Sequence, residues 1–70
     1  MKGYHALGEH ARKVLNETHA KHMGAMGSSE KEKYTRGQIK EVKLNQQEQV
    51  IEVRFRNGEL FKYTKAGTWY

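Results

Sequence analysis

The sequence predicts an α+β fold in which an N-terminal amphipathic helix packs on a three-stranded antiparallel β-meander. Apolar residues recur with the helical period of about 3.6 over residues 4–23. From residue 38 onward they recur with the strand period of about 2, and an Asn57-Gly58 pair typical of a hairpin turn interrupts them. The 70 residues have room for one domain, with the helix and the start of a linker in residues 1–28 and the meander in residues 29–70.

The helix is predicted by two complementary faces. Charged residues of alternating sign follow one another at i,i+4 spacing, and each such pair stabilises a helix by about 0.2–0.5 kcal/mol. Gly24 stands where a left-handed C-terminal cap would lie, and Gly3 is the only candidate for a cap at the start. The charged face comprises Glu9, Lys13, Glu17 and Lys21, and the apolar face comprises Tyr4, Leu7, Ala11, Val14, Leu15, Thr18 and His22.

Small and charged residues predict a linker over residues 24–35. Two interpretations of its beginning stay open. The run from His22 to Ser28 is similar to the residues that cloning into an expression vector leaves, in which case residues 1–28 are foreign to the natural protein. The other interpretation, a natural Gly/Ser linker, is favoured because the two ordered faces of the helix suit docking on another surface.

The hairpin around Asn57-Gly58 allows two registers. A two-residue type I′ turn would place Val53 opposite Lys62, which puts a lysine in the apolar face. A three-residue loop, with Gly58 in the left-handed bulge position, places Val53 opposite Phe61 and Ile51 opposite Tyr63. Because a slip of one residue moves every side chain to the other face, we expect the second register.

Cross-strand charge pairs place the first strand at about residues 38–45. Pairing Val42 with Val53 and Leu44 with Ile51 brings Lys43 opposite Glu52, whereas a shift of two residues would oppose two glutamates. The turn then lies within residues 46–49. The predicted outer face is a charge ladder of Lys43, Glu52, Lys62, Glu41 and Arg54, and the predicted inner face comprises Val42, Leu44, Ile51, Val53, Phe55, Phe61 and Tyr63.

Residues 65–70 follow the last strand and end on two aromatic side chains. Two conformations stay open for them, a short fourth strand or a fold back over the edge of the core. Trp69 is expected to complete a small core, while Tyr70 is freer to contact a partner.

Composition excludes several classes of function. The chain has no cysteine, which removes disulfides, thiol catalysis and thiolate metal sites, and suits a cytoplasmic location. No apolar run approaches the roughly 18 residues of a membrane span, so we expect no membrane association. So small a core is marginal, and self-association into a homodimer is one way to stabilise it.

Catalysis and metal binding are not expected. His19 and His22 have an i,i+3 spacing that suits a metal, and His5 precedes Glu9 by one turn, but no third ligand accompanies either pair. Every acidic residue is Glu, and a core of one layer leaves little room for a pocket. We therefore predict neither an enzyme nor a cofactor.

The net charge of +5 raises nucleic-acid binding as one function. The ladder, however, neutralises the centre of the predicted outer face and leaves a basic rim of Arg36, Lys40, Arg56 and Lys65. The first hypothesis is a small regulatory or adaptor protein that binds a protein partner, and the alternative is a basic module that contacts phosphates through this rim. The candidate partner-binding residues are Arg36, Lys40, Arg56, Leu60, Lys65, Trp69 and Tyr70.

Overall fold

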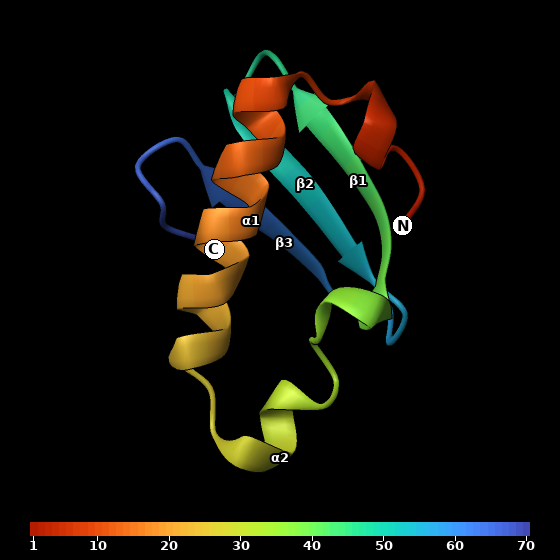
Figure 1. The fold of residues 1–70 in the computed structure, drawn as a ribbon, viewed down its shortest axis with the longest axis vertical. Helices are drawn as coiled ribbons and strands as arrows, with labels where there is room; N and C mark the ends of the chain where they lie inside the picture. The colour runs from red at the N-terminus through yellow and green to blue at the C-terminus, as the bar shows by residue number, and fades with distance from the viewer.

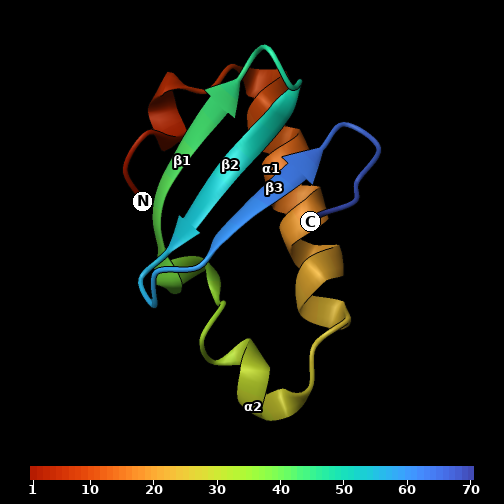
Figure 2. The same ribbon diagram turned by 180° about the vertical axis from the view of Figure 1, so that it is seen from behind.

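The computed structural model describes all 70 residues and shows one helix lying across one face of a three-stranded antiparallel sheet. This is the predicted α+β arrangement. The opposite face of the sheet has no covering element (Figure 2). The elements in chain order are η1 (Tyr4–Ala6), α1 (Glu9–Gly24), α2 (Ser28–Lys31), η2 (Arg36–Gln38), β1 (Ile39–Asn45), β2 (Val50–Phe55) and β3 (Leu60–Thr64), with the strands in the order β1-β2-β3 (Figure 1).

Both predicted registers are confirmed. Val42 pairs with Val53 across β1 and β2, and Val53 pairs with Phe61 across β2 and β3. The Phe55 N–H donates to the Glu59 carbonyl, and Gly58 has a φ of 92°, so the loop is the three-residue form with a left-handed glycine. A residue with a side chain would be strained at this position.

The main helix begins later than the periodicity predicts. Leu7 is extended, with a ψ of 143°, and Gly8 is the N-cap, so α1 starts at Glu9. The preceding residues form a single 3-10 turn after Gly3, whose φ is 87°. The apolar stripe still faces inward throughout, because Leu7 is buried and Tyr4 packs against the core although neither lies in α1.

The helix end also differs from the prediction. Gly24 is the last residue of α1 and is not left-handed; Ala25 is the C-cap, in the right-handed helical region. The predicted linker contains one helical turn, α2. Tyr34, which follows α2 in the linker, is buried. Tyr34 was not predicted in the core because the charged residues around it hide its role.

The core lies between α1 and the inner face of the sheet. Leu15 from α1, together with Val53 and Phe55 from β2, has no exposed surface. Two residues placed on the inner face are less covered than predicted. Phe61 is partly buried, and Leu44 is 40 % exposed because α1 packs mainly against β3 and Leu44 lies on β1, the opposite edge strand. The nine residues of the main core are Leu7, Leu15, Tyr34, Ile39, Val42, Ile51, Val53, Phe55 and Tyr63.

The outer face carries the predicted charges in register but not the predicted ladder of ion pairs. Lys43 lies opposite Glu52, and Glu52 lies opposite Lys62, yet neither pair forms a salt bridge. Lys62 instead pairs with Glu48 of the β1–β2 turn, with Nζ and Oε2 2.8 Å apart. The Glu52 carboxylate accepts a hydrogen bond from the Asn45 amide at 3.2 Å. The β1–β2 turn, closed by the hydrogen bonds between Asn45 and Glu48, brings the Glu48 carboxylate within reach of Lys62.

Terminal segments pair with both edges of the sheet. Lys2 donates its N–H to the Lys40 carbonyl and accepts from the Val42 N–H, which adds a short parallel bridge to β1. Tyr70 exchanges two backbone hydrogen bonds with Lys62 of β3. Of the two conformations left open for residues 65–70, the structure does not show a fourth strand. The segment turns back beside β3, joins it through an isolated antiparallel bridge between Tyr63 and Trp69, and packs Trp69 against the core. None of the helices has the length and apolar character needed to cross a membrane.

Candidate functional site

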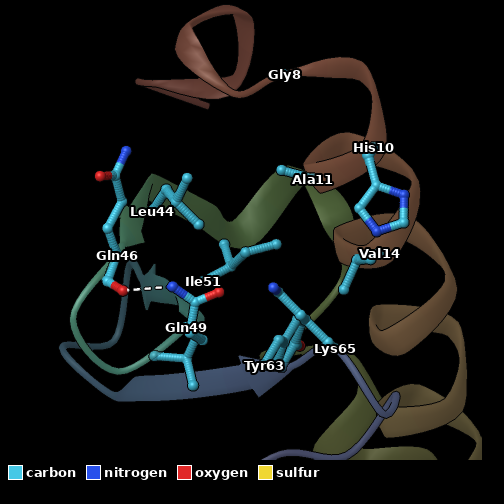
Figure 3. A pocket seen from close by; sticks show the side chains of 11 residues that line it. Gly8, His10, Ala11, Val14, Leu44, Gln46, Gln49, Ile51, Tyr63 and Lys65 are labelled. Carbon is cyan, nitrogen blue, oxygen red and sulfur yellow. Dashed lines mark hydrogen bonds between the residues drawn. The ribbon is translucent and has the colours of Figure 1, made fainter.

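An apolar groove lies between the first turns of α1 and the end of the sheet that carries the β1–β2 turn (Figure 3). Its volume is about 330 Å³, at the lower end of the range of about 300–1,000 Å³ that small-ligand sites occupy. Such a space suits one or two side chains of a partner. The residues that line it are Gly8, His10, Ala11, Val14, Leu44, Gln46, Gln49, Val50, Ile51, Tyr63 and Lys65.

The base of the groove comes from all three strands. Leu44, Ile51 and Tyr63 stand side by side because Leu44 pairs with Ile51 and Ile51 pairs with Tyr63. Ile51 and Tyr63 are buried, whereas Leu44 is exposed, so Leu44 is the part of the base that a ligand reaches first. Ala11 and Val14, both partly buried, form the wall on α1. The apolar part of the site thus continues the core outward.

The rim of the groove is polar and carries one full charge. Lys65 points into the groove in Figure 3, and its ammonium group has no hydrogen-bond or ion-pair partner. The side-chain amide nitrogen of Gln49 donates to the backbone carbonyl of Gln46 at 2.6 Å, which leaves the side-chain oxygen of Gln49 free. The side-chain amide of Gln46 and the ring of His10 form no hydrogen bond within the protein.

No carboxylate lines the groove. Glu48 is the one acidic residue of the adjacent turn, and its carboxylate is held on the other side of the sheet by Lys62 and by the Asn45 amide. The side-chain Oδ1 of Asn45 also accepts a hydrogen bond from the Glu48 N–H at 3.1 Å, which closes the turn. Gln49 follows with a φ of 59°, a left-handed conformation that residues other than glycine adopt at a cost. The turn therefore places Gln46 and Gln49 at the groove and holds the Glu48 carboxylate on the opposite face of the sheet.

Buried beneath α1, His22 lies at the centre of an aromatic cluster. Its Nδ1 is 2.8 Å from the Tyr63 hydroxyl, and its ring stacks on Trp69 with centroids 4.8 Å apart and contacts Phe61 edge-on at 4.5 Å. Burial lowers the pKa of His22, and the nearby His19 lowers it further. Burial raises the pKa of the Tyr63 hydroxyl. This histidine is part of the core and has no access to a ligand.

His19 and His22, whose spacing suits a metal ion, both form hydrogen bonds within the protein. His19 Nε2 is 2.7 Å from the Tyr34 carbonyl oxygen, and His22 is bound to Tyr63. No three His, Cys, Asp or Glu side chains come together as a metal ion would require.

The predicted basic rim does not form one surface. Arg36 and Arg56 lie at the end of the sheet opposite the groove, whereas Lys65 lines the groove. The Arg36 guanidinium bonds the Asn16 side chain and lies 4.8 Å from the centre of the Tyr4 ring. That cluster lowers the pKa of Tyr4, mainly through the hydrogen bond from Asn16. Arg56 donates to the Gly37 carbonyl at 3.2 Å, and Lys40 is exposed without a side-chain partner.

The three apolar candidates are divided between the two faces. Trp69 stacks on His22 and packs against the core, as expected. Leu60 and Tyr70 are 39 % and 63 % exposed, and both lie on the outer face beside Lys62. Among the candidate residues, only Lys65 therefore lies at the groove.

Sequence reasoning missed the groove because its members were assigned elsewhere. The alternation of apolar residues predicts Leu44 on the inner face, and the segment between the strands predicts Gln46 and Gln49 as turn residues. No signal in the sequence marks the groove, because Leu44 follows the same alternation as the buried Val42. Comparison with known proteins finds no family model, no curated protein and no solved structure that matches this chain.

Proposed function

We propose that this chain is a non-enzymatic regulatory or adaptor module that binds a protein partner through the groove between α1 and the β1–β2 turn. The observation that carries the proposal is an apolar base, including the exposed Leu44, beside polar side chains that form no hydrogen bond or ion pair within the protein, those of His10, Gln46 and Lys65. Protein recognition commonly combines a buried apolar contact with a polar rim of this kind. The groove has room for an inserted side chain and offers no paired nucleophile and base.

The chain provides a matched pair of variants for a test. Leu44 and Leu60 have nearly the same exposed fraction, 40 % and 39 %, but lie on opposite faces of the sheet. The wild-type protein, Leu44→Glu and Leu60→Glu are each used as bait in a lysate of the source organism, and the retained proteins are quantified by mass spectrometry. We expect one protein to be retained by the wild type and by Leu60→Glu but lost with Leu44→Glu. If no protein depends on Leu44, the proposal is wrong; dependence on Leu60 would instead place the interface on the outer face.

The alternative function, nucleic-acid binding, is favoured by a different observation. Of the thirteen Lys and Arg side chains, only Lys33 and Lys62 form ion pairs, so most of the positive charge is available to phosphates. Titration of the isotope-labelled protein with a short duplex and a single strand, at low and at physiological salt, tests this alternative. Amide shifts confined to residues near Arg36, Lys40 and Arg56 that fade with salt would support it, and an absence of shifts at low salt would exclude it.

A further inference from the structure

The chemistry of the groove restricts the partner that it accepts. Lys65 is the only fully charged residue in the lining, and no carboxylate is present to pair with it. The nearest acid of the turn, Glu48, is bound to Lys62 on the outer face. An occupant therefore gains most when it brings a negative charge to Lys65, because that ammonium group has no partner within the chain.

The rest of the lining indicates a peptide as the occupant. Primary amides both donate and accept hydrogen bonds, as peptide groups do, and the Gln46 side chain and the Gln49 carbonyl oxygen are free to pair with a backbone. The two glutamines lie on one side of the groove, and α1 forms the other (Figure 3). The apolar lining between them is largely aliphatic and includes Leu44 and Ile51 of the base and Val14 of the wall.

Resting on the proposed function, we infer that the groove binds an acidic segment of the partner protein in which aliphatic side chains adjoin carboxylates. The aliphatic side chains pack on Leu44 and Ile51, and the segment's backbone pairs with the amides of Gln46 and Gln49. A flanking carboxylate of the partner approaches Lys65. The segment is short, because a volume of about 330 Å³ holds one or two side chains.

Three synthetic pentapeptides test this inference by amide NMR titration of the full chain. The acidic probe is acetyl-Glu-Leu-Leu-Glu-Glu-amide. The basic control replaces each Glu by Lys, and the polar control replaces each Leu by Ser. We expect the acidic probe to shift the amides of Ala11, Leu44 and Gln49 with a dissociation constant of about 1 mM or tighter. The basic control should bind at least about threefold more weakly, and the polar control should cause no localised shifts.

Reversing the charge of Lys65 tests whether this residue causes the preference for the acidic peptide. Lys65→Glu should weaken binding of the acidic probe about threefold or more and strengthen binding of the basic control. Lys31→Glu makes the same change of net charge at an exposed position on α2, which lies at the opposite end of the molecule from the β1–β2 turn and the start of α1 (Figure 1), and it should leave both affinities unchanged. An unfolded variant would be recognised by loss of dispersion in its spectrum before peptide is added.

Three results would overturn the inference. They are an absence of groove shifts with the acidic probe, equal binding of the basic control, and equal effects of Lys65→Glu and Lys31→Glu. If these results accompany a partner whose capture depends on Leu44, the protein-binding function stands and the assigned chemistry of the occupant is wrong. If no such partner is captured, the function itself fails.

Discussion

His22 of α1 and Tyr63 of β3 share a buried hydrogen bond, with imidazole Nδ1 and the phenolic oxygen 2.8 Å apart. The two residues are 41 positions apart in sequence, and this is the buried polar contact that joins helix to sheet. Burial lowers the pKa of His22 and raises the pKa of Tyr63, because it disfavours both the imidazolium and the phenolate. The contact therefore holds while both groups are neutral.

This arrangement predicts loss of stability in mild acid. Because the pKa of His22 is lowered in the folded state, the unfolded chain takes up the proton first as the pH falls below about 6.5. The free energy of unfolding that neutral, buried His22 contributes is fully present above that pH and is lost as the pH falls toward the pKa of His22 in the folded state. Urea unfolding at pH 7.5 and pH 5.5 should show a lower midpoint at pH 5.5. The double variant His22→Phe, Tyr63→Phe should show a smaller difference and His10→Gln an unchanged one; an equal difference in all three proteins would assign the effect elsewhere.

The hydroxyl of Thr18 predicts a stabilising substitution. Thr18 is buried on α1, and its Oγ1 has no hydrogen-bond partner, which costs about 1–3 kcal/mol. Thr18→Val keeps the shape and removes the unpaired hydroxyl, so the free energy of unfolding should rise by about 1 kcal/mol. Thr64→Val is the matched control, since the Thr64 hydroxyl is bonded to Thr68 at 2.6 Å, and it should give no gain. Urea denaturation measures both, and a loss of stability in Thr18→Val would contradict the prediction.

The left-handed residue Gln49 predicts a second gain. Gln49→Gly should raise the free energy of unfolding by about 0.5 kcal/mol, because glycine adopts a positive φ without the Cβ penalty. Gln46→Gly, in the same turn but without a positive φ, should lower it by a similar amount. Thermal unfolding compares the two variants. Equal losses in both would mean that the Gln49 backbone is not strained.

The inner face of β2 predicts a severe loss. Val53 has no exposed surface, and Val53→Asp would bury an unpaired carboxylate, costing more than about 3 kcal/mol, comparable to the stability of a domain this small. Arg54→Asp introduces the same side chain at the next, exposed position and should leave the protein folded. Amide dispersion in a two-dimensional NMR spectrum separates the outcomes. A dispersed spectrum for Val53→Asp would contradict the assignment of the inner face.

Much of the fold was predictable because local patterns specify it. The alternation around Val53 and the turn at Asn57-Gly58 together set both strand registers, since a slip of one residue would bury Lys62. The periodicity predicts too early a helix start, because the apolar stripe continues through Leu7. The backbone is extended at Leu7 and Gly8, so α1 begins only at Glu9. Periodicity reports which face a residue occupies and not whether the backbone is continuous.

The candidate site was far less predictable. A groove depends on which strands a helix covers, and Leu44 is exposed because α1 packs mainly against β3 while Leu44 lies on β1, the opposite edge of the sheet. The outer charges show a related limit: the register placed Lys62 opposite Glu52 correctly, but the choice of Glu48 as its ion-pair partner depends on the shape of the β1–β2 turn.

The pairing of the terminal segments with the sheet edges has a consequence for self-association. Lys2 and Tyr70 occupy backbone groups on β1 and β3 that would otherwise be free to pair with strands of another molecule. Fraying of residues 68–70 would unpair Lys62 on a strand that also carries the exposed Leu60. Each terminal pairing therefore covers part of one sheet edge, and we expect its loss to favour intermolecular β-pairing of otherwise folded molecules.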